Sequence, residues 1–175
     1  MAETAGGLEP QTDGWFVLNA ADACWWHNDA FGEKCRFEAR ERPFPQIALS
    51  LVVLHHGRPN CMYHGENIQE DFLVLSGECL LLVEGEERPL KAWDFVHCPD
   101  WTEHVFVGAG DGPCAILMIG ARHEHEELLY PVVEVARKHD AGVAKETSSG
   151  REAYAPFPEP TAGPYRDGTL PSLPD

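Results

Sequence analysis

Hydrophobic and polar residues alternate with a period of two through the middle of the chain, and turn-forming residues interrupt the pattern at short intervals. Short strands separated by Gly, Pro and Asp are typical of an all-β sandwich or barrel. We therefore predict an all-β fold. Strands are predicted within residues 47–54, 71–83 (with a turn at Ser76-Gly77), 93–100 and 104–120, with a hairpin at Glu84-Gly85-Glu86.

Two of these strands, at residues 51–54 and 80–83, are apolar at every position. A strand that is apolar on both faces must be covered on both. One face would line the interior of the barrel. The other needs the N-terminal segment, a C-terminal strap or a second subunit, so a homodimer is a reasonable hypothesis.

The two ends of the chain differ from the middle. The first dozen residues predict a flexible arm, and residues 132–139 predict the one helix. From Gly150 onward the prolines exclude helix and central strand, which leaves either disorder or an extended strap. Three aromatic residues in this tail favour the strap: Tyr154, Phe157 and Tyr165.

Composition limits the functional classes. A chain of 175 residues suits one domain. The formal net charge of −16 argues against binding to nucleic acid or to an anionic membrane, and it suggests a cation or a small molecule held in a cavity. No apolar run is long enough to span a bilayer, and no N-terminal export signal is recognisable. The six cysteines are then expected to be reduced, and the protein to be cytoplasmic.

Candidate metal ligands gather around one predicted strand. His64 and Glu66 are two residues apart, so both point the same way on an extended strand, and Glu70 has the same parity. His104 lies on a later strand. If the two strands pair, two imidazoles and two carboxylates converge in one cavity. Such a set suits Zn, Fe(II), Mn, Ni or Co, with coordination positions left open for a substrate.

The same residues carry a resemblance to a known family. Residues 57–77 resemble the first motif of the cupin superfamily. That motif has a glycine, two histidines separated by one residue, a glutamate and a second glycine, in this order. Here the motif is Gly57, His64, Glu66, Glu70 and Gly77. Residues 93–108 are similar to the second cupin motif, with Pro99 and His104 in register. The resemblance covers roughly residues 45–120.

This resemblance implies a cupin jelly-roll barrel that holds one divalent transition metal, with His64, Glu70 and His104 as ligands. Glu66 stands where the family has a second histidine, so it is either a fourth ligand or a catalytic base beside the metal. Oxygen ligands shift the preference among Mn, Fe(II), Zn and Ni towards Mn or Fe(II). The two glycines of the second motif are replaced by Trp93 and Trp101.

Other interpretations compete with this one. The cluster could be the polar end of a hairpin with no metal, although the joint register of both motifs favours a site. His123 and His125 have metal-like spacing but are expected in a solvated connection, and Cys61-x-x-His64 is a weak zinc signal. Trp101 is expected at the barrel mouth, where an indole could cover a ligand. The remaining candidate cavity walls, each equally consistent with plain core, are Phe72, Val74, Trp93, Phe95 and Phe106.

The sequence thus predicts four segments and two candidate functions. The first function is a metal-dependent enzyme acting on a small organic molecule, of the dioxygenase, isomerase, decarboxylase or lyase type that the family includes. The second is a non-catalytic module that binds a metal or a small ligand. The segments are an N-terminal arm and extension (1–44), a cupin barrel core (45–120), a helical segment (121–149) and an extended Pro/Gly-rich tail (150–175).

Overall fold

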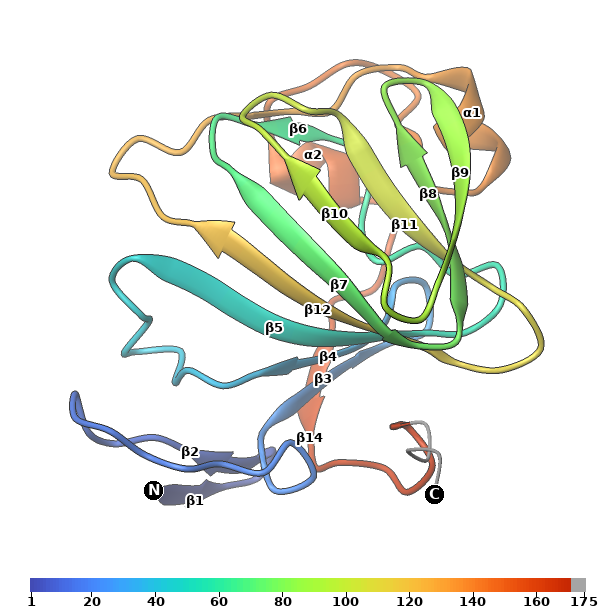
Figure 1. Cartoon of the computed structure of the whole chain (residues 1–175). Coiled ribbons are helices and arrows are strands. Elements are labelled where there is room, and N and C mark those ends of the chain that lie inside the picture. Colours follow the sequence, from blue (N-terminus) through green and yellow to red (C-terminus); the bar gives the residue numbers. More distant parts are fainter. Residues whose placement is uncertain (171–175) are drawn as a thin grey trace.

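The computed structural model describes residues 1–170, which form mainly antiparallel β-structure. The largest sheet, here called the large sheet, has seven strands, and every neighbouring pair in it is antiparallel (Figure 1). The all-β prediction is therefore confirmed. In spatial order the strands are β10 (Phe95–Cys98), β7 (Glu70–Ser76), β12 (Cys114–Ala121), β5 (Ile47–Leu54), β4 (Gly32–Arg36), β3 (Trp25–Asn28) and β14 (Thr161–Gly163).

A second, small sheet packs against one end of the large sheet, and Figure 1 shows the two beside each other. Its strands, in spatial order, are β11 (His104–Ala109), β8 (Glu78–Val83) and β9 (Glu86–Lys91). The predicted hairpin joins β8 to β9 through Glu84 and Gly85, both at positive φ, as a tight two-residue turn requires. Two-stranded pairs complete the β-structure: β1 (Ala2–Thr4) with β2 (Gly7–Glu9), and β6 (Gly65–Glu66) with β13 (Leu128–Leu129).

The main hydrophobic core lies between the two sheets. Val52 and Val74 come from the large sheet, and Leu81 and Phe106 come from the small sheet; all four are buried in one cluster. Burying a side chain of this size stabilises the fold by about 1.5–3 kcal/mol. Two packed antiparallel sheets around one core are the architecture of a jelly roll.

The outer faces of the apolar strands are covered within the chain. Leu51 and Val53 of β5 pack with Trp25 from the N-terminal extension. Leu82 of β8 packs with Ala136, which lies on helix α1 (Glu134–Lys138), inside the region predicted to be helical. The N-terminal and C-terminal segments thus supply the cover that these strands need, without a second subunit.

The prediction of a flexible N-terminal arm is wrong for residues 2–9, which form the β1–β2 hairpin. The Thr4 hydroxyl accepts a hydrogen bond from the Gly6 N–H at 3.1 Å and donates one to the Gly7 carbonyl at 2.8 Å. Gly7 has φ +128°, a conformation that only glycine adopts readily. A short polar turn of this kind has no apolar pattern, so periodicity does not reveal it.

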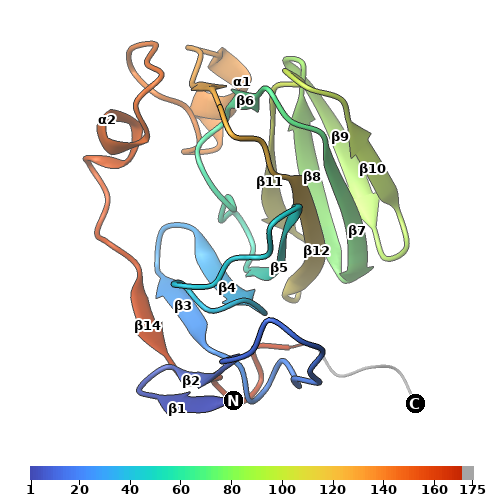
Figure 2. The ribbon, with the colours of Figure 1, turned by 90° about the vertical axis from the view of Figure 1, so that its left-hand side faces the viewer.

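The tail combines one helical turn with the predicted strap. Residues Gly150–Tyr154 form helix α2, which the expectation for this tail excluded; the first proline comes only at Pro156, beyond the helix. The strap itself is confirmed as far as residue 170: β14 pairs with β3, and Figure 2 shows the chain from α2 to β14 along one side of the molecule. Residues 171–175 of the predicted tail lie outside the described part.

The two tryptophans that replace motif glycines keep a glycine-like backbone. Trp93 has φ +76° and Trp101 has φ +62°. Positive φ costs a residue with a Cβ about 1–2 kcal/mol, which the surrounding strands must offset. The fold therefore needs the backbone conformation at these positions, and it tolerates a side chain there because both indoles reach solvent, with 75% and 45% of their surface exposed.

All six cysteines lie within the described residues, and all six are free thiols. Five are buried and Cys61 is half-buried. Among residues 1–170, no helix has the length and apolar character needed to cross a membrane.

Candidate metal centre

The four predicted ligands come from three strand ends that meet at one place. His64 immediately precedes β6, which contains Glu66, and Glu70 is the first residue of β7. His104 is the first residue of β11. An antiparallel bridge joins the two histidines: the His104 N–H donates to the His64 carbonyl at 2.9 Å, and the His64 N–H donates to the His104 carbonyl at 3.3 Å. The structure thus contains the strand pairing that the prediction requires.

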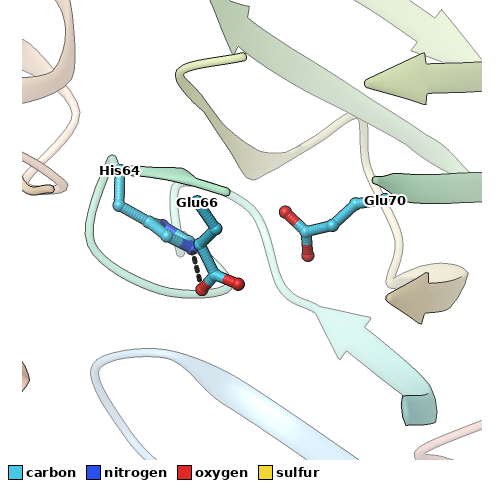
Figure 3. Close-up of side chains that lie close together, drawn as sticks. All are labelled: His64, Glu66 and Glu70. Atoms are coloured by element: carbon cyan, nitrogen blue, oxygen red, sulfur yellow. Dashed lines mark hydrogen bonds and ion pairs between the residues drawn. The ribbon is translucent and has the colours of Figure 1, made fainter. Parts of the chain in front are cut away.

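Ligand atoms of His64, Glu66 and Glu70 all lie within 4.8 Å of one another (Figure 3). In Figure 3 the Glu70 carboxylate points towards the other two side chains. His104 is outside this three-residue group, but its Nε2 is 3.4 Å from Glu70 Oε2, and its ring centroid is 5.6 Å from that of His64. All four side chains are therefore neighbours.

Each histidine is oriented by its own backbone neighbour. His64 Nδ1 lies 2.7 Å from the Met62 carbonyl, and His104 Nδ1 lies 2.9 Å from the Thr102 carbonyl. A carbonyl only accepts, so Nδ1 carries the proton and donates in both rings. This leaves both Nε2 atoms as the ones that face the carboxylates, and a histidine metal ligand is held in this way.

The contact between His64 and Glu66 has the geometry expected when a proton or a metal ion lies between the two side chains. His64 Nε2 is 3.0 Å from Glu66 Oε1. With Nδ1 already protonated, both of these atoms would be acceptors unless a proton or a metal ion lay between them. In the metal-free protein a proton fills this role: burial opposes a charged His64 ring, but Cys61 and Glu66 outweigh it and raise the His64 pKa well above its usual value. The pKa of Glu66 is lowered, because contacts with His64 outweigh its burial.

The contact between His104 and Glu70 is a neutral pair. Burial and the neighbouring His64 lower the pKa of His104 to about 4, and burial together with Glu66 raises the pKa of Glu70 to about 7. Between these values the imidazole is uncharged and the carboxyl holds its proton, so the 3.4 Å contact is not an ion pair. Two crowded carboxylates and two Nε2 atoms are a donor set that suits a divalent transition metal.

Two residues beside the site have no sequence signal in the motifs. Lys34 on β4 interacts electrostatically with both Glu66 and Glu70, and its burial, together with Arg36, lowers the pKa of the ammonium group. The Tyr130 ring centroid is 5.6 Å from that of His64. On β4 the two basic residues, Lys34 and Arg36, are two positions apart. Lys34 lies near the site because of the way β4 pairs with β5, and the sequence of one strand does not reveal that pairing.

Most of the other flagged residues stay apart from the site. His123 and His125 are exposed in the loop between β12 and β13, as expected. Cys61 Sγ lies 3.8 Å from His64 Nδ1, on the side of the ring away from Glu66. Phe72, Val74 and Phe106 belong to the core, where the rings of Phe72 and Phe106 also pack edge-on against His104, with ring centroids 5.1 and 6.1 Å from its own. As cavity walls, Trp93 and Phe95 are wrong choices, because they are 75% and 64% exposed.

The fold and the site define a class: a small jelly roll with histidines and carboxylates gathered at neighbouring strand ends. Residues 50–120 match a family model described as the cupin domain. This match assigns a cupin domain to the central part of the chain, about two fifths of its length. No curated protein sequence matches the chain significantly.

Solved structures extend the match beyond the motif region. The polyketide cyclase RemF from Streptomyces resistomycificus is 12% identical with a TM-score of 0.55, covering 65% of this chain and 84% of that one. A predicted oxalate decarboxylase from Thermotoga maritima is 17% identical with a TM-score of 0.52, covering 62% and 100%. A sugar phosphate isomerase from Silicibacter pomeroyi is 18% identical with a TM-score of 0.49, covering 92% and 89%. The similarities to the first two structures show the shared fold.

Proposed function

We propose that this protein is a metal-dependent cupin enzyme that acts on a small organic molecule. The observation that carries the proposal is the convergence of His64, Glu66, Glu70 and His104, with both imidazole Nε2 atoms directed at carboxylate oxygens. A bound divalent metal would supply Lewis acidity or redox chemistry at this point. Mn and Fe(II) suit two oxygen donors best, with Zn and Ni as alternatives.

The roles of the four side chains follow from their hydrogen bonds. The Met62 and Thr102 carbonyls hold the two rings so that Nε2 of His64 and of His104 face the site. Glu70 is the carboxylate ligand of the family pattern. Glu66 either completes the ligand set or takes a proton from the substrate as a base; its lowered pKa keeps it ionised, which suits both roles.

The reaction type is not set by the fold. Solved structures with the same fold include a polyketide cyclase and a predicted oxalate decarboxylase, at 12% and 17% identity. An isomerase, decarboxylase, lyase or dioxygenase reaction is compatible with a ligand set of two histidines and two carboxylates. Enzyme chemistry is favoured over simple metal storage because Lys34, whose charge acts on Glu66 and Glu70, lines a cavity that could admit a small molecule.

Metal analysis of the purified protein tests the ligand set. The wild type should bind about one divalent metal per chain, and His64→Ala and His104→Ala should each lose it. His125→Ala, a change at an exposed histidine, is the matched control and should bind as the wild type does. Equal, sub-stoichiometric metal in the wild type and both site variants would show that the assignment is wrong.

The Glu66→Gln variant separates the two roles of that residue. As a ligand, Glu66 contributes affinity, and its replacement should weaken metal binding about 10–100-fold or more. As a base, it can be replaced with little loss of metal. A crystal structure of the loaded protein with four protein ligands, a closed coordination shell and no route to the cavity would contradict the enzyme proposal and favour a binding module.

We further propose a cytoplasmic location and a homodimer with a small-molecule ligand in the barrel. Six free thiols suit a reducing compartment. Phe95, the first residue of the edge strand β10, and Trp93 just before it are exposed and would offer an apolar surface to a second copy. Light scattering after size-exclusion chromatography that shows only monomer would remove the dimer.

A further inference from the structure

A cavity of about 1090 Å³ lies between strands β3 and β4 on one side and the chain from α2 towards β14 on the other. Figure 2 shows this C-terminal stretch beside β3 and β4. Asn28 links the two walls, because its side-chain amide donates to the Pro158 carbonyl at 3.0 Å. The volume is in the range of sites for small molecules.

The charge of this cavity is opposite to that of the whole chain. The chain has 13 basic and 29 acidic residues. Five of the basic residues line the cavity, against three acidic ones, Glu9, Glu38 and Glu159, so the lining has a formal charge of +2 (5 − 3) within a protein of −16. Basic side chains are therefore concentrated here far beyond their share. The five are Lys34, Arg36, Arg40, Arg122 and Arg151.

One acidic and one basic residue of the lining neutralise each other. Glu38 pairs with Arg122 at 2.6 Å and accepts a hydrogen bond from the Phe44 N–H at 2.7 Å, so its carboxylate is already satisfied. Among residues 1–170, no ion pair within 4.0 Å involves Arg36, Arg40 or Arg151. These three guanidinium groups are exposed around the mouth and available to a ligand.

The strand pattern of β4 places Lys34 both in the cavity wall and on the inner face of the large sheet. Lys34 and Arg36 share one face, while Cys35 between them is buried in the outer core. Lys34 is opposite Val52 of β5, which faces the barrel interior. Lys34 is half-buried in the cavity wall, and its charge acts on Glu66 and Glu70, although none of the four candidate ligands lines the cavity itself.

The remaining walls are aromatic. Trp26 lies opposite Lys34 on β3, and Phe31 packs edge-on against Phe157 with ring centroids 4.7 Å apart. Aromatic walls and a group of arginines suit different parts of one molecule. The aromatic side chains contact a planar body, and the guanidinium groups pair with carboxylate or phosphate oxygens.

We propose that this cavity binds a small organic anion, with a carboxylate or phosphate group among Arg36, Arg40 and Arg151 and a flat apolar body against Trp26 and Phe31. The role of that anion as substrate rests on the proposed function, because the chemistry would come from the metal ion. The binding itself does not depend on the metal.

Calorimetric titration tests the binding. The probes are benzoate and phenyl phosphate as anions and benzyl alcohol as the uncharged counterpart, each titrated into the full chain in EDTA. At least one anion should bind at least about tenfold more tightly than benzyl alcohol, and its affinity should fall as salt is added. Binding of benzoate alone identifies a carboxylate site, and binding of phenyl phosphate alone identifies a phosphate site. Equal affinity for benzyl alcohol, or no binding of either anion, would overturn the proposal.

Variants locate the site. Arg36→Gln and Arg151→Gln, from opposite walls, should each weaken binding of the anion roughly tenfold. Arg88→Gln, on strand β9 away from the cavity, is the matched control and should bind as the wild type does. Unchanged binding in both cavity variants would refute the assignment.

The two proposals fail in distinguishable ways. Anion binding by a protein that takes up no metal would leave this cavity standing and remove the enzyme. Metal binding that depends on His64 and His104, in a protein that binds neither anion, would remove the cavity proposal alone.

Discussion

Replacement of Glu70 by glutamine should stabilise the metal-free protein at alkaline pH. Burial and the neighbouring Glu66 raise the pKa of Glu70 from 4.5 to about 7 in the folded state. The folded chain thus holds this proton more tightly than the unfolded chain does. Stability from this group is fully present below pH 4.5 and is lost as the pH rises through about 7.

The size of the effect follows from the difference between the two pKa values. One pKa unit corresponds to about 1.4 kcal/mol, so ionising Glu70 in the folded, metal-free protein costs about 3 kcal/mol by pH 8. Glutamine resembles the protonated acid and does not ionise. Glu70→Gln should therefore match the wild type near pH 4.5 and exceed its free energy of unfolding by about 3 kcal/mol near pH 8.

Urea denaturation in EDTA at both pH values measures this difference, with the exposed Glu124→Gln as control. Added divalent metal should reverse the order, because a ligand that binds only the folded state stabilises the wild type and not a variant that lacks a metal ligand. If Glu70→Gln is no more stable than the wild type near pH 8 in EDTA, burial of the Glu70 carboxylate beside Glu66 does not carry this cost.

Three further predictions concern backbone and thiols. Trp93→Gly should raise the free energy of unfolding by about 0.5–1 kcal/mol in urea, since it relieves φ +76° at an exposed side chain; a loss of stability would contradict this. Gly77→Ala should cost more than about 2 kcal/mol by the same measurement, because its Cβ would lie 2.5 Å from the Pro113 carbonyl oxygen at φ +74°; a neutral change would show that the turn relaxes. Ellman's reagent should titrate one thiol of the native protein near pH 8, Cys61, and none in Cys61→Ser, while burial raises the pKa of Cys35 to about 12 and keeps it unreactive; rapid reaction of several thiols would contradict the packed core.

The barrel core was predictable because its strands carry strong local signals. The apolar run at residues 47–54 and the Gly77 and Gly85 turns place β5, β7, β8 and β9 without reference to the rest of the chain. The hairpin β1–β2 and helix α2 are short and polar, so neither has a periodic apolar face. They form because a turn side chain or the Ser149 cap stabilises them locally.

The candidate site was predictable for a different reason. His64, Glu66 and Glu70 are close along the chain, and the spacing of Pro99 and His104 fits a known pattern. Lys34 was missed because its place near Glu66 depends on the pairing of β4 with β5, a contact between distant parts of the chain. Likewise, Trp93 and Trp101 replace the glycines of the second motif but have positive φ, and a sequence does not show backbone angles.

The cavity and the candidate metal centre are encoded in separate stretches of the chain. The four candidate ligands all lie within residues 50–120, whereas of the described residues that line the cavity only Asn60 does. The segments before and after residues 50–120 can therefore change in sequence without replacing a candidate metal ligand. Such changes would alter which molecules the cavity accepts. A protein trimmed to the recognisable domain would keep its ligands and lose nearly every wall of its cavity.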